Sequence, residues 1–144
     1  MIGCLLTGHG QFAPGLFDAL EMIAGPQTYF EVVPFLEEDL GIFEGKIATA
    51  LKNLLTKTDG VLILTDLLGG TPFKTTMFLS NANEKIEVLA GTNLPMLIEI
   101  SHWRLQANDV QVMMKMAVSI GQETIVAGEL HLKETETFSE EEGI

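Results

Sequence analysis

The sequence predicts a single α/β domain built on a doubly wound, mainly parallel sheet. Three observations favour this fold class. The chain has 144 residues, a length typical of one domain. Short apolar segments alternate along it with longer segments of helical periodicity. One of the short segments, residues 61–65, is almost wholly apolar, as strands covered on both faces of a sheet are.

The strands and helices are predicted in alternation along one domain, residues 1–132, followed by an acidic tail, residues 133–144. The strands are expected over residues 2–7, 29–33, 61–65 and 86–90, with a weaker final strand, antiparallel to the others, over residues 124–132. The helices are expected from Phe12 to Gly25, through residues 43–55, from Pro72, from Pro95 to about Trp103, and after Asn108 or Asp109. Pro34 is expected to end the second strand, and residues 35–41 to form an acidic loop.

Local signals place the helix ends. The first helix stops at Gly25-Pro26, because glycine is common just past a helix end and proline cannot continue a helix. Pro72 and Pro95 each suit the first helical position, where the missing N–H costs no hydrogen bond. The buried faces of the first two helices are expected to consist of Phe12, Leu16, Leu20 and Ile23, and of Phe43, Ile47, Leu51, Leu54 and Leu55.

Composition excludes several classes of protein. The formal net charge is −12, whereas binding to a nucleic-acid backbone needs a basic face, so no nucleic-acid partner is expected. The single cysteine, Cys4, excludes a disulfide framework and makes a structural zinc site improbable. No apolar run approaches the roughly 20 residues of a membrane helix, and the N-terminus lacks the basic region of a signal peptide. These features predict a cytoplasmic protein without a cofactor or metal ion.

Two polar residues follow strands that the predicted topology makes neighbours. Right-handed crossovers favour the strand order 2-1-3-4, in which strands 1 and 3 are adjacent and the chain changes direction between them. Ligands bind at such a switch point, beyond the carboxyl ends of the strands. His9 follows strand 1 and Asp66 follows strand 3. Both are therefore expected at the same edge of the sheet.

The neighbours of these two residues suit phosphoryl chemistry. His9 lies between Gly8 and Gly10, so a bulky partner can approach its ring. Asp66 precedes Gly69-Gly70-Thr71-Pro72, a loop that leads into a helix, and free N–H groups at a helix N-terminus favour phosphate. A nucleophilic imidazole, a carboxylate that orients it and an anion-binding loop are the parts of a phosphohistidine site. We predict in-line phosphoryl transfer to His9 without a metal ion.

Each residue also has an ordinary interpretation. His9 alone could be a loop residue, Asp66 a helix cap or turn residue, and Gly69–Thr71 a simple helix entry. His102 and His131 lack comparable neighbours and are expected to be structural or superficial. The methionines at 113, 114 and 116 are expected in packing. The acidic residues at 37–39 have no second cluster of matching spacing that would indicate a metal site.

At these residues the sequence resembles the IIA component of the mannose-family bacterial sugar phosphotransferase system, in its mannose, N-acetylgalactosamine and gluconate branches. The matching stretches are LTGHGQFAPGL (6–16), GVLILTDLLGGTPF (60–73), EVLAGTNLPMLIE (87–99) and, more weakly, residues 113–121. The resemblance spans most of the chain, to about residue 128. The pairing of Gly-His-Gly with Asp-x-x-Gly-Gly-Thr-Pro-Phe is specific, although each half alone is not.

The resemblance implies a phosphoryl carrier. His9 would be phosphorylated by the histidine phosphocarrier HPr and would pass the group to a IIB component, and so indirectly to the membrane components that take up sugar. Asp66 would be its hydrogen-bonding partner, and Gly69, Gly70 and Thr71 would hold the phosphoryl oxygens. Family members form homodimers, often with an exchanged final strand. The sequence departs from some members at Leu67-Leu68, where a polar residue and a tryptophan are usual, and at residues 35–41, which lack a Pro-Gly-Glu-like turn.

Three alternatives remain at this point. A phosphotransfer subunit of a dihydroxyacetone kinase has a similar sequence and would serve a kinase instead of a transporter. A flavodoxin-like or receiver module, a non-enzymatic binding protein, shares the fold class, but a receiver needs an acid after strand 1 and leaves His9 unexplained. A histidine phosphatase would need Arg-His-Gly, whereas Gly8 precedes His9.

Overall fold

The computed structural model describes residues 1–130 and contains one four-stranded parallel sheet. The strands are β1 (Ile2–His9), β2 (Phe30–Phe35), β3 (Gly60–Leu64) and β4 (Ile86–Leu89). The helices are α1 (Phe12–Ala24), α2 (Phe43–Leu55), α3 (Thr71–Leu79), α4 (Leu94–Trp103) and α5 (Val110–Glu123), with a short 3-10 helix η1 (Glu37–Asp39). The strand order is β2-β1-β3-β4, which confirms the predicted order and the α/β fold class.

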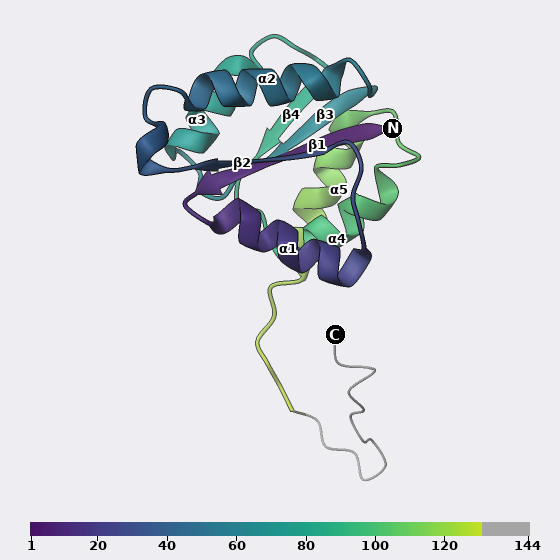
Figure 1. Ribbon diagram of the computed structural model, residues 1–144. Coiled ribbons are helices and arrows are strands. Elements are labelled where there is room, and N and C mark those ends of the chain that lie inside the picture. Colours follow the sequence, from purple (N-terminus) through teal and green to yellow (C-terminus); the bar gives the residue numbers. More distant parts are fainter. Residues whose placement is uncertain (131–144) are drawn as a thin grey trace.

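Helices cover both faces of the sheet. Figure 1 shows α2 and α3 on one face and α1, α4 and α5 on the other. Alternate residues of β1 divide between the two layers: Cys4 and Leu6 belong to the core cluster beneath α1, α4 and α5, while Leu5 belongs to the cluster beneath α2. In β3, Leu62 and Ile63 divide in the same way. Double coverage therefore explains why β3 is apolar throughout and why every residue of β1 except His9 is buried.

The crossovers bring the end of β1 to the switch point of the sheet. β1 lies between β2 and β3, and the helices that follow β1 and β2 cover opposite faces. The register pairs Leu6 with Leu64 of β3, and His9 with Phe35 of β2. The last residue of β1 therefore lies at the carboxyl edge, between the segments that follow its two neighbouring strands.

Side-chain caps fix the starts of the last two helices. The Asn93 side chain accepts a hydrogen bond from the Met96 N–H at 3.1 Å. Asp109, one of the two predicted caps, accepts from the N–H groups of Gln111 and Val112 at 3.0 and 3.3 Å. Substituting such a cap by alanine typically costs about 1 kcal/mol. None of the helices in residues 1–130 is long and apolar enough to cross a membrane.

The segment that was expected to end at Pro34 and continue as an acidic loop is more ordered than predicted. β2 continues through Pro34 to Phe35. This is possible because β2 is an edge strand, where a missing N–H need not remove a ladder bond. The next residues form η1, in which Asp39 is buried and its Oδ1 accepts a hydrogen bond from Lys46 Nζ at 2.9 Å.

The predicted final strand over residues 124–132 is not formed in the part of it that the structure describes. Thr124 ends α5, and residues 125–130 have no regular secondary structure. Ile125, Val126 and Leu130 are all exposed there. Figure 1 shows this segment leading away from the sheet and helices. A strand needs a neighbouring strand, and this segment pairs with none in residues 1–130. Residues 131–144, with His131 and the acidic tail, lie outside the described residues.

Candidate functional site

The structure brings His9 and Asp66 together at the switch point, as the topology predicted. His9 Nδ1 lies 2.8 Å from Asp66 Oδ2, within hydrogen-bonding distance. The backbone N–H of His9 donates to the same oxygen, also at 2.8 Å. One carboxylate oxygen thus binds both the backbone and the ring of His9, which holds Nδ1 of the imidazole close to the end of β1.

The Asp66 carboxylate is held in the ionised form. Burial alone raises the pKa of this carboxyl, but hydrogen bonds from the His9 N–H, the His9 ring and the Leu67 N–H outweigh it, so its pKa is lowered from the ordinary value. The side chain of Asp66 is 12% exposed, compared with 48% for His9. The orienting group is therefore sheltered while the imidazole is open to solvent and to a partner.

The lowered pKa of Asp66 predicts a dependence of stability on acid. A carboxylate whose folded pKa lies below its unfolded value of 3.8 contributes stability that is complete above that value and is lost as the pH falls through the folded pKa. Asp66→Asn should therefore be less stable than the wild-type chain above the unfolded pKa, and the difference should shrink below it. Urea unfolding of dilute protein from neutral pH downward measures this, and a constant difference at every pH would contradict it.

The ring of His9 has one nitrogen bound and one free for chemistry. Since Nδ1 faces a carboxylate, it carries the proton in the neutral ring, and Nε2 keeps its lone pair. Gly70 lies beside this second edge. A Cβ atom at Gly70 would lie 2.9 Å from Cε1 and 3.7 Å from Nε2 of His9, so the close approach of this loop requires glycine.

The other glycines of the motifs have distinct roles. A Cβ atom at Gly8 would lie 2.7 Å from Phe12 Cδ1 and 3.0 Å from Asp66 Cγ, so Gly8 leaves space for the carboxylate. Gly10 and Gly69 have positive φ angles of 55° and 80°, a conformation that other residues rarely adopt. Glycine is thus required on both sides of His9 for different reasons. Packing requires it at Gly8, and the backbone turn requires it at Gly10.

The loop after β3 leads into a helix N-terminus beside the ring. Gly70 is the N-cap residue of α3, and its own N–H donates to the Leu67 carbonyl at 3.1 Å. Thr71 opens the helix, and Pro72 contributes no N–H. The first-turn N–H groups of Thr71 and Phe73 have no partner within a helix and are available to an anion. Of the predicted loop, Gly70 lies beside the His9 ring and Thr71 is the first residue of α3.

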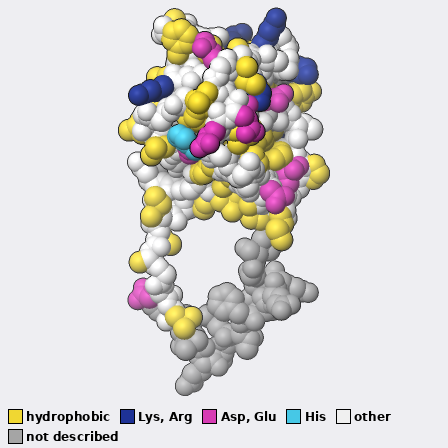
Figure 2. Space-filling view, turned by 60° about the vertical axis from the view of Figure 1, so that its left-hand side comes forward, with side chains coloured by type: hydrophobic (Ala, Val, Ile, Leu, Met, Phe, Trp, Pro, Cys, Tyr) yellow, Lys and Arg dark blue, Asp and Glu magenta, His cyan; other side chains and the backbone are white. Residues whose placement is uncertain are grey.

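The surface around His9 is apolar and acidic. A cavity of about 470 Å³ opens beside it, lined by Gly10, Phe35, Leu36, Glu37, Glu38 and Leu40. On the Asp66 side, Leu67 and Leu68 are 60% and 74% exposed. Figure 2 shows a face of the molecule on which acidic and hydrophobic side chains border a histidine. Exposed leucines gathered on one face are typical of a protein-docking surface.

Other candidate residues lie apart from this site. His102 is exposed, and its ring packs against Trp103 with centroids 5.0 Å apart. Met113 is buried, and Met114 and Met116 pack against the same core cluster, which confirms their role in packing. Within residues 1–130, no three His, Cys, Asp or Glu side chains are grouped to hold a metal ion.

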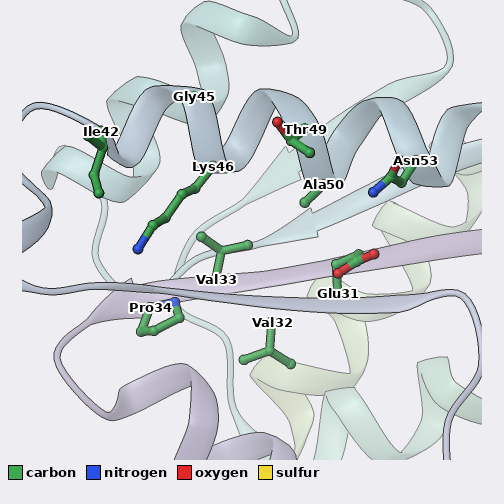
Figure 3. Close-up of a pocket in the computed structure, with 10 residues that line it drawn as sticks. All are labelled: Glu31, Val32, Val33, Pro34, Ile42, Gly45, Lys46, Thr49, Ala50 and Asn53. Atoms are coloured by element: carbon green, nitrogen blue, oxygen red, sulfur yellow. The ribbon is translucent and has the colours of Figure 1, made fainter.

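A cavity of about 680 Å³ lies between β2 and α2, and its lining includes neither His9 nor Asp66 (Figure 3). Its lining combines apolar residues of the edge strand, such as Val33, with Lys46 and Thr49 of the helix. None of its lining residues belongs to the predicted site.

The residue that sequence reasoning missed at the site is Phe35, whose ring contacts that of His9 with centroids 5.7 Å apart. An aromatic residue at the end of a strand does not, from sequence alone, predict a contact with His9.

Comparison with known proteins identifies related chains. The family model described as the fructose IIA component of the phosphotransferase system matches residues 3–118. The fructose-specific EIIA component of Bacillus subtilis is 33% identical over 101 residues, which is 69% of this chain and 68% of that protein. The sorbose-specific EIIA component of Lacticaseibacillus casei is 35% identical over 109 residues, 75% of each chain.

Solved structures share the fold. The mannose/sorbose-specific IIA subunit from Enterococcus faecalis has a TM-score of 0.81 and 28% identity, and the alignment covers 91% of this chain and 97% of that one. The family match, residues 3–118, spans the positions of His9 and Asp66. The chain therefore belongs to the IIA components of the mannose family of sugar phosphotransferase systems, which transfer phosphoryl groups in sugar uptake.

Proposed function

We propose that His9 is the residue that carries the phosphoryl group, accepting it from phospho-HPr and passing it to a IIB component in the cytoplasm. One observation carries this assignment: the bond between His9 Nδ1 and Asp66 leaves Nε2 free beside the N-terminus of α3. The imidazole is half exposed, as a group must be that reacts with two different proteins in turn.

The bonds formed and broken in the transfer balance without a cofactor. Nε2 of neutral His9 attacks the phosphorus of the donor's phosphohistidine, a new Nε2–P bond forms, and the donor's N–P bond breaks. The donor ring keeps the electron pair of that bond and becomes neutral. The ring of His9, which retains its Nδ1 proton, becomes cationic, and the Asp66 carboxylate stabilises this charge across 2.8 Å. Transfer to the IIB component repeats the step in reverse.

The loop of Gly69, Gly70 and Thr71 would hold the transferred group. The phosphoryl oxygens carry the negative charge of the reaction, and first-turn N–H groups with the positive end of the helix dipole favour such charge. Gly70 allows these groups to lie against the ring edge that bears Nε2. Leu40, Leu67 and Leu68 supply apolar surface on which both protein partners could dock.

Phosphorylation with site mapping tests the proposal. Incubation with phosphoenolpyruvate, enzyme I and HPr should place one phosphoryl group per chain on His9, in an acid-labile and base-stable bond. His9→Gln should remove the label, while His102→Gln, which changes an exposed histidine elsewhere on the surface, should retain it. Recovery of the label on His102, His131 or Asp66 would refute the assignment. The fructose and sorbose relatives do not favour the dihydroxyacetone kinase alternative.

We also propose that the chain forms a homodimer by adding the segment after α5 to a partner's sheet. Ile125, Val126 and Leu130 expose apolar surface, and β4 lies at the edge of the sheet. An edge strand presents unpaired N–H and C=O groups to which another strand can add. Sedimentation at micromolar concentration should give the mass of a dimer, and deletion of residues 125–144 should give a monomer. A monomeric full-length chain would contradict this proposal.

A further inference from the structure

Phe35 contacts the reactive imidazole from the side opposite Asp66. It is the last residue of β2 and is paired in register with His9, the last residue of β1. The two rings meet edge to face, with centroids 5.7 Å apart and an interplanar angle of 71°. Asp66 follows β3, on the other side of β1. The two contacts therefore reach His9 from the two strands that flank its own.

The ring of Phe35 is itself held in place. Its centroid lies 4.9 Å from that of Phe43, the buried first residue of α2. Its backbone carbonyl accepts a hydrogen bond from the Gly10 N–H at 2.8 Å, which ties the chain on the far side of His9 to the end of β2. Phe35 also packs against the core cluster beneath α2. A side chain anchored at its ring and its backbone can restrain the group that it touches.

The hydrogen bond to Asp66 does not by itself fix the ring. It holds Nδ1, but a half-exposed imidazole bound at one nitrogen can still tilt about that contact. Gly70 limits the movement of the Cε1 edge on the loop side. A flat ring packed on the remaining side would complete the restraint.

We infer that Phe35 is a positioning residue for His9, which keeps the imidazole aligned so that Nε2 points toward the start of α3. This inference rests on the proposed function, because the alignment matters only if Nε2 receives the phosphoryl group. Phe35 does not touch the reacting atoms; it acts through His9. Removal of the Phe35 ring should displace the nucleophile Nε2 and so lower the transfer rate.

The test compares Phe35→Leu with Phe30→Leu, a matched control at the other end of the same strand. Phe30 makes a similar aromatic contact, to Phe17 with centroids 4.9 Å apart, and lies far from the carboxyl edge. Phe35→Leu should lower the transfer rate at saturating phospho-HPr by about 2- to 10-fold, the factor that an aromatic pair supplies, with the apparent KM for HPr near the wild-type value. Phe30→Leu should leave the rate unchanged, and Phe35→Tyr should restore it.

Nitrogen NMR of the free protein reports on the ring nitrogens of His9. Their chemical shifts would not change if Phe35 served only to pack the core. In Phe35→Leu the ring nitrogens of His9 should shift toward a mixture of the two tautomers, while in Phe30→Leu they should match the wild-type chain. If Phe35→Leu does not fold, Phe35→Met supplies the same comparison. An unchanged rate with unchanged nitrogen shifts would overturn the inference, as would a rise in KM alone, which would make Phe35 a docking residue.

The two hypotheses fail in different ways. If the wild-type chain accepts no phosphoryl group from HPr on His9, the proposed function is wrong, and the positional role loses its purpose. If the wild-type chain is labelled at the normal rate and Phe35→Leu behaves identically, only the positional role is wrong. The nitrogen spectra need no donor protein and report on His9 in either case.

Discussion

Replacing Asp66 with alanine should slow phosphoryl transfer from HPr to His9 by roughly 10- to 10³-fold. The reason is the tautomer: without the carboxylate at 2.8 Å, the neutral ring no longer prefers its proton on Nδ1, and Nε2 is protonated in part of the population. The cation formed during transfer also loses its counter-charge. In hydrolase triads, loss of this role costs about 10⁴-fold, and we expect less here because a phosphohistidine is a better leaving group. A rapid-quench measurement of transfer gives the rate.

The same carboxylate also supports the backbone, so the rate must be measured alongside a thermal melt. Asp66 accepts hydrogen bonds from the N–H groups of His9 and Leu67, and alanine would leave both without this acceptor. Each such loss costs roughly 1–3 kcal/mol if the group stays buried, less where water reaches it. Asp66→Asn keeps the size of the side chain and helps to separate the effect on the transfer rate from the effect on backbone stability. A wild-type rate in a folded Asp66 variant would mean that this carboxylate does not orient His9.

The position of His9 and Asp66 could be predicted because it depends on topology alone. Both follow parallel strands, and the handedness of the crossovers leaves few strand orders that a chain of this pattern can adopt. β1 and β3 are then neighbours in the sheet, and their polar successors meet. The elements were also predictable where strong local signals mark them, such as the Asp109 cap and the apolar face of α2.

Features that depend on register or on a neighbouring side chain could not be predicted in this way. Pro34 marked a strand end in sequence, yet β2 includes it, because an edge strand tolerates a missing donor. The contact between Phe35 and His9 depends on a one-residue register that the apolar pattern of β2 does not specify. Asp39 was expected in an acidic loop, whereas it lies in a 3-10 helix, is buried and accepts a hydrogen bond from Lys46.

The two adjacent glycines of the loop after β3 look equivalent in sequence but are required for different reasons. Gly69 has a φ of 80°, so a side chain there is strained by the backbone, although its Cβ would meet nothing within 4 Å. Gly70 has an ordinary extended conformation, with φ −72° and ψ 167°. The imidazole is the nearest obstacle to a side chain at Gly70, since a Cβ there would lie 2.9 Å from His9 Cε1 and 3.3 Å from the Leu67 carbonyl oxygen. The requirement at Gly70 therefore comes chiefly from the site, through the contact with His9.

Gly70→Ala should consequently impair transfer with little loss of stability. The methyl group must displace either the ring or the loop by several tenths of an ångström, and a misplacement of about 1 Å can cost about 10²-fold in rate. We expect a fall of about 10- to 10²-fold in the rapid-quench rate, with shifted His9 ring nitrogens in the NMR spectrum.

Gly45→Ala is the matched control: it makes the same chemical change in α2, where a Cβ would meet nothing within 4 Å. That variant should transfer at the wild-type rate and be slightly more stable, because alanine favours a helix over glycine by about 1 kcal/mol. Equal rates for Gly70→Ala and Gly45→Ala would show that the loop does not need to lie against the ring, and that the phosphoryl group is held elsewhere.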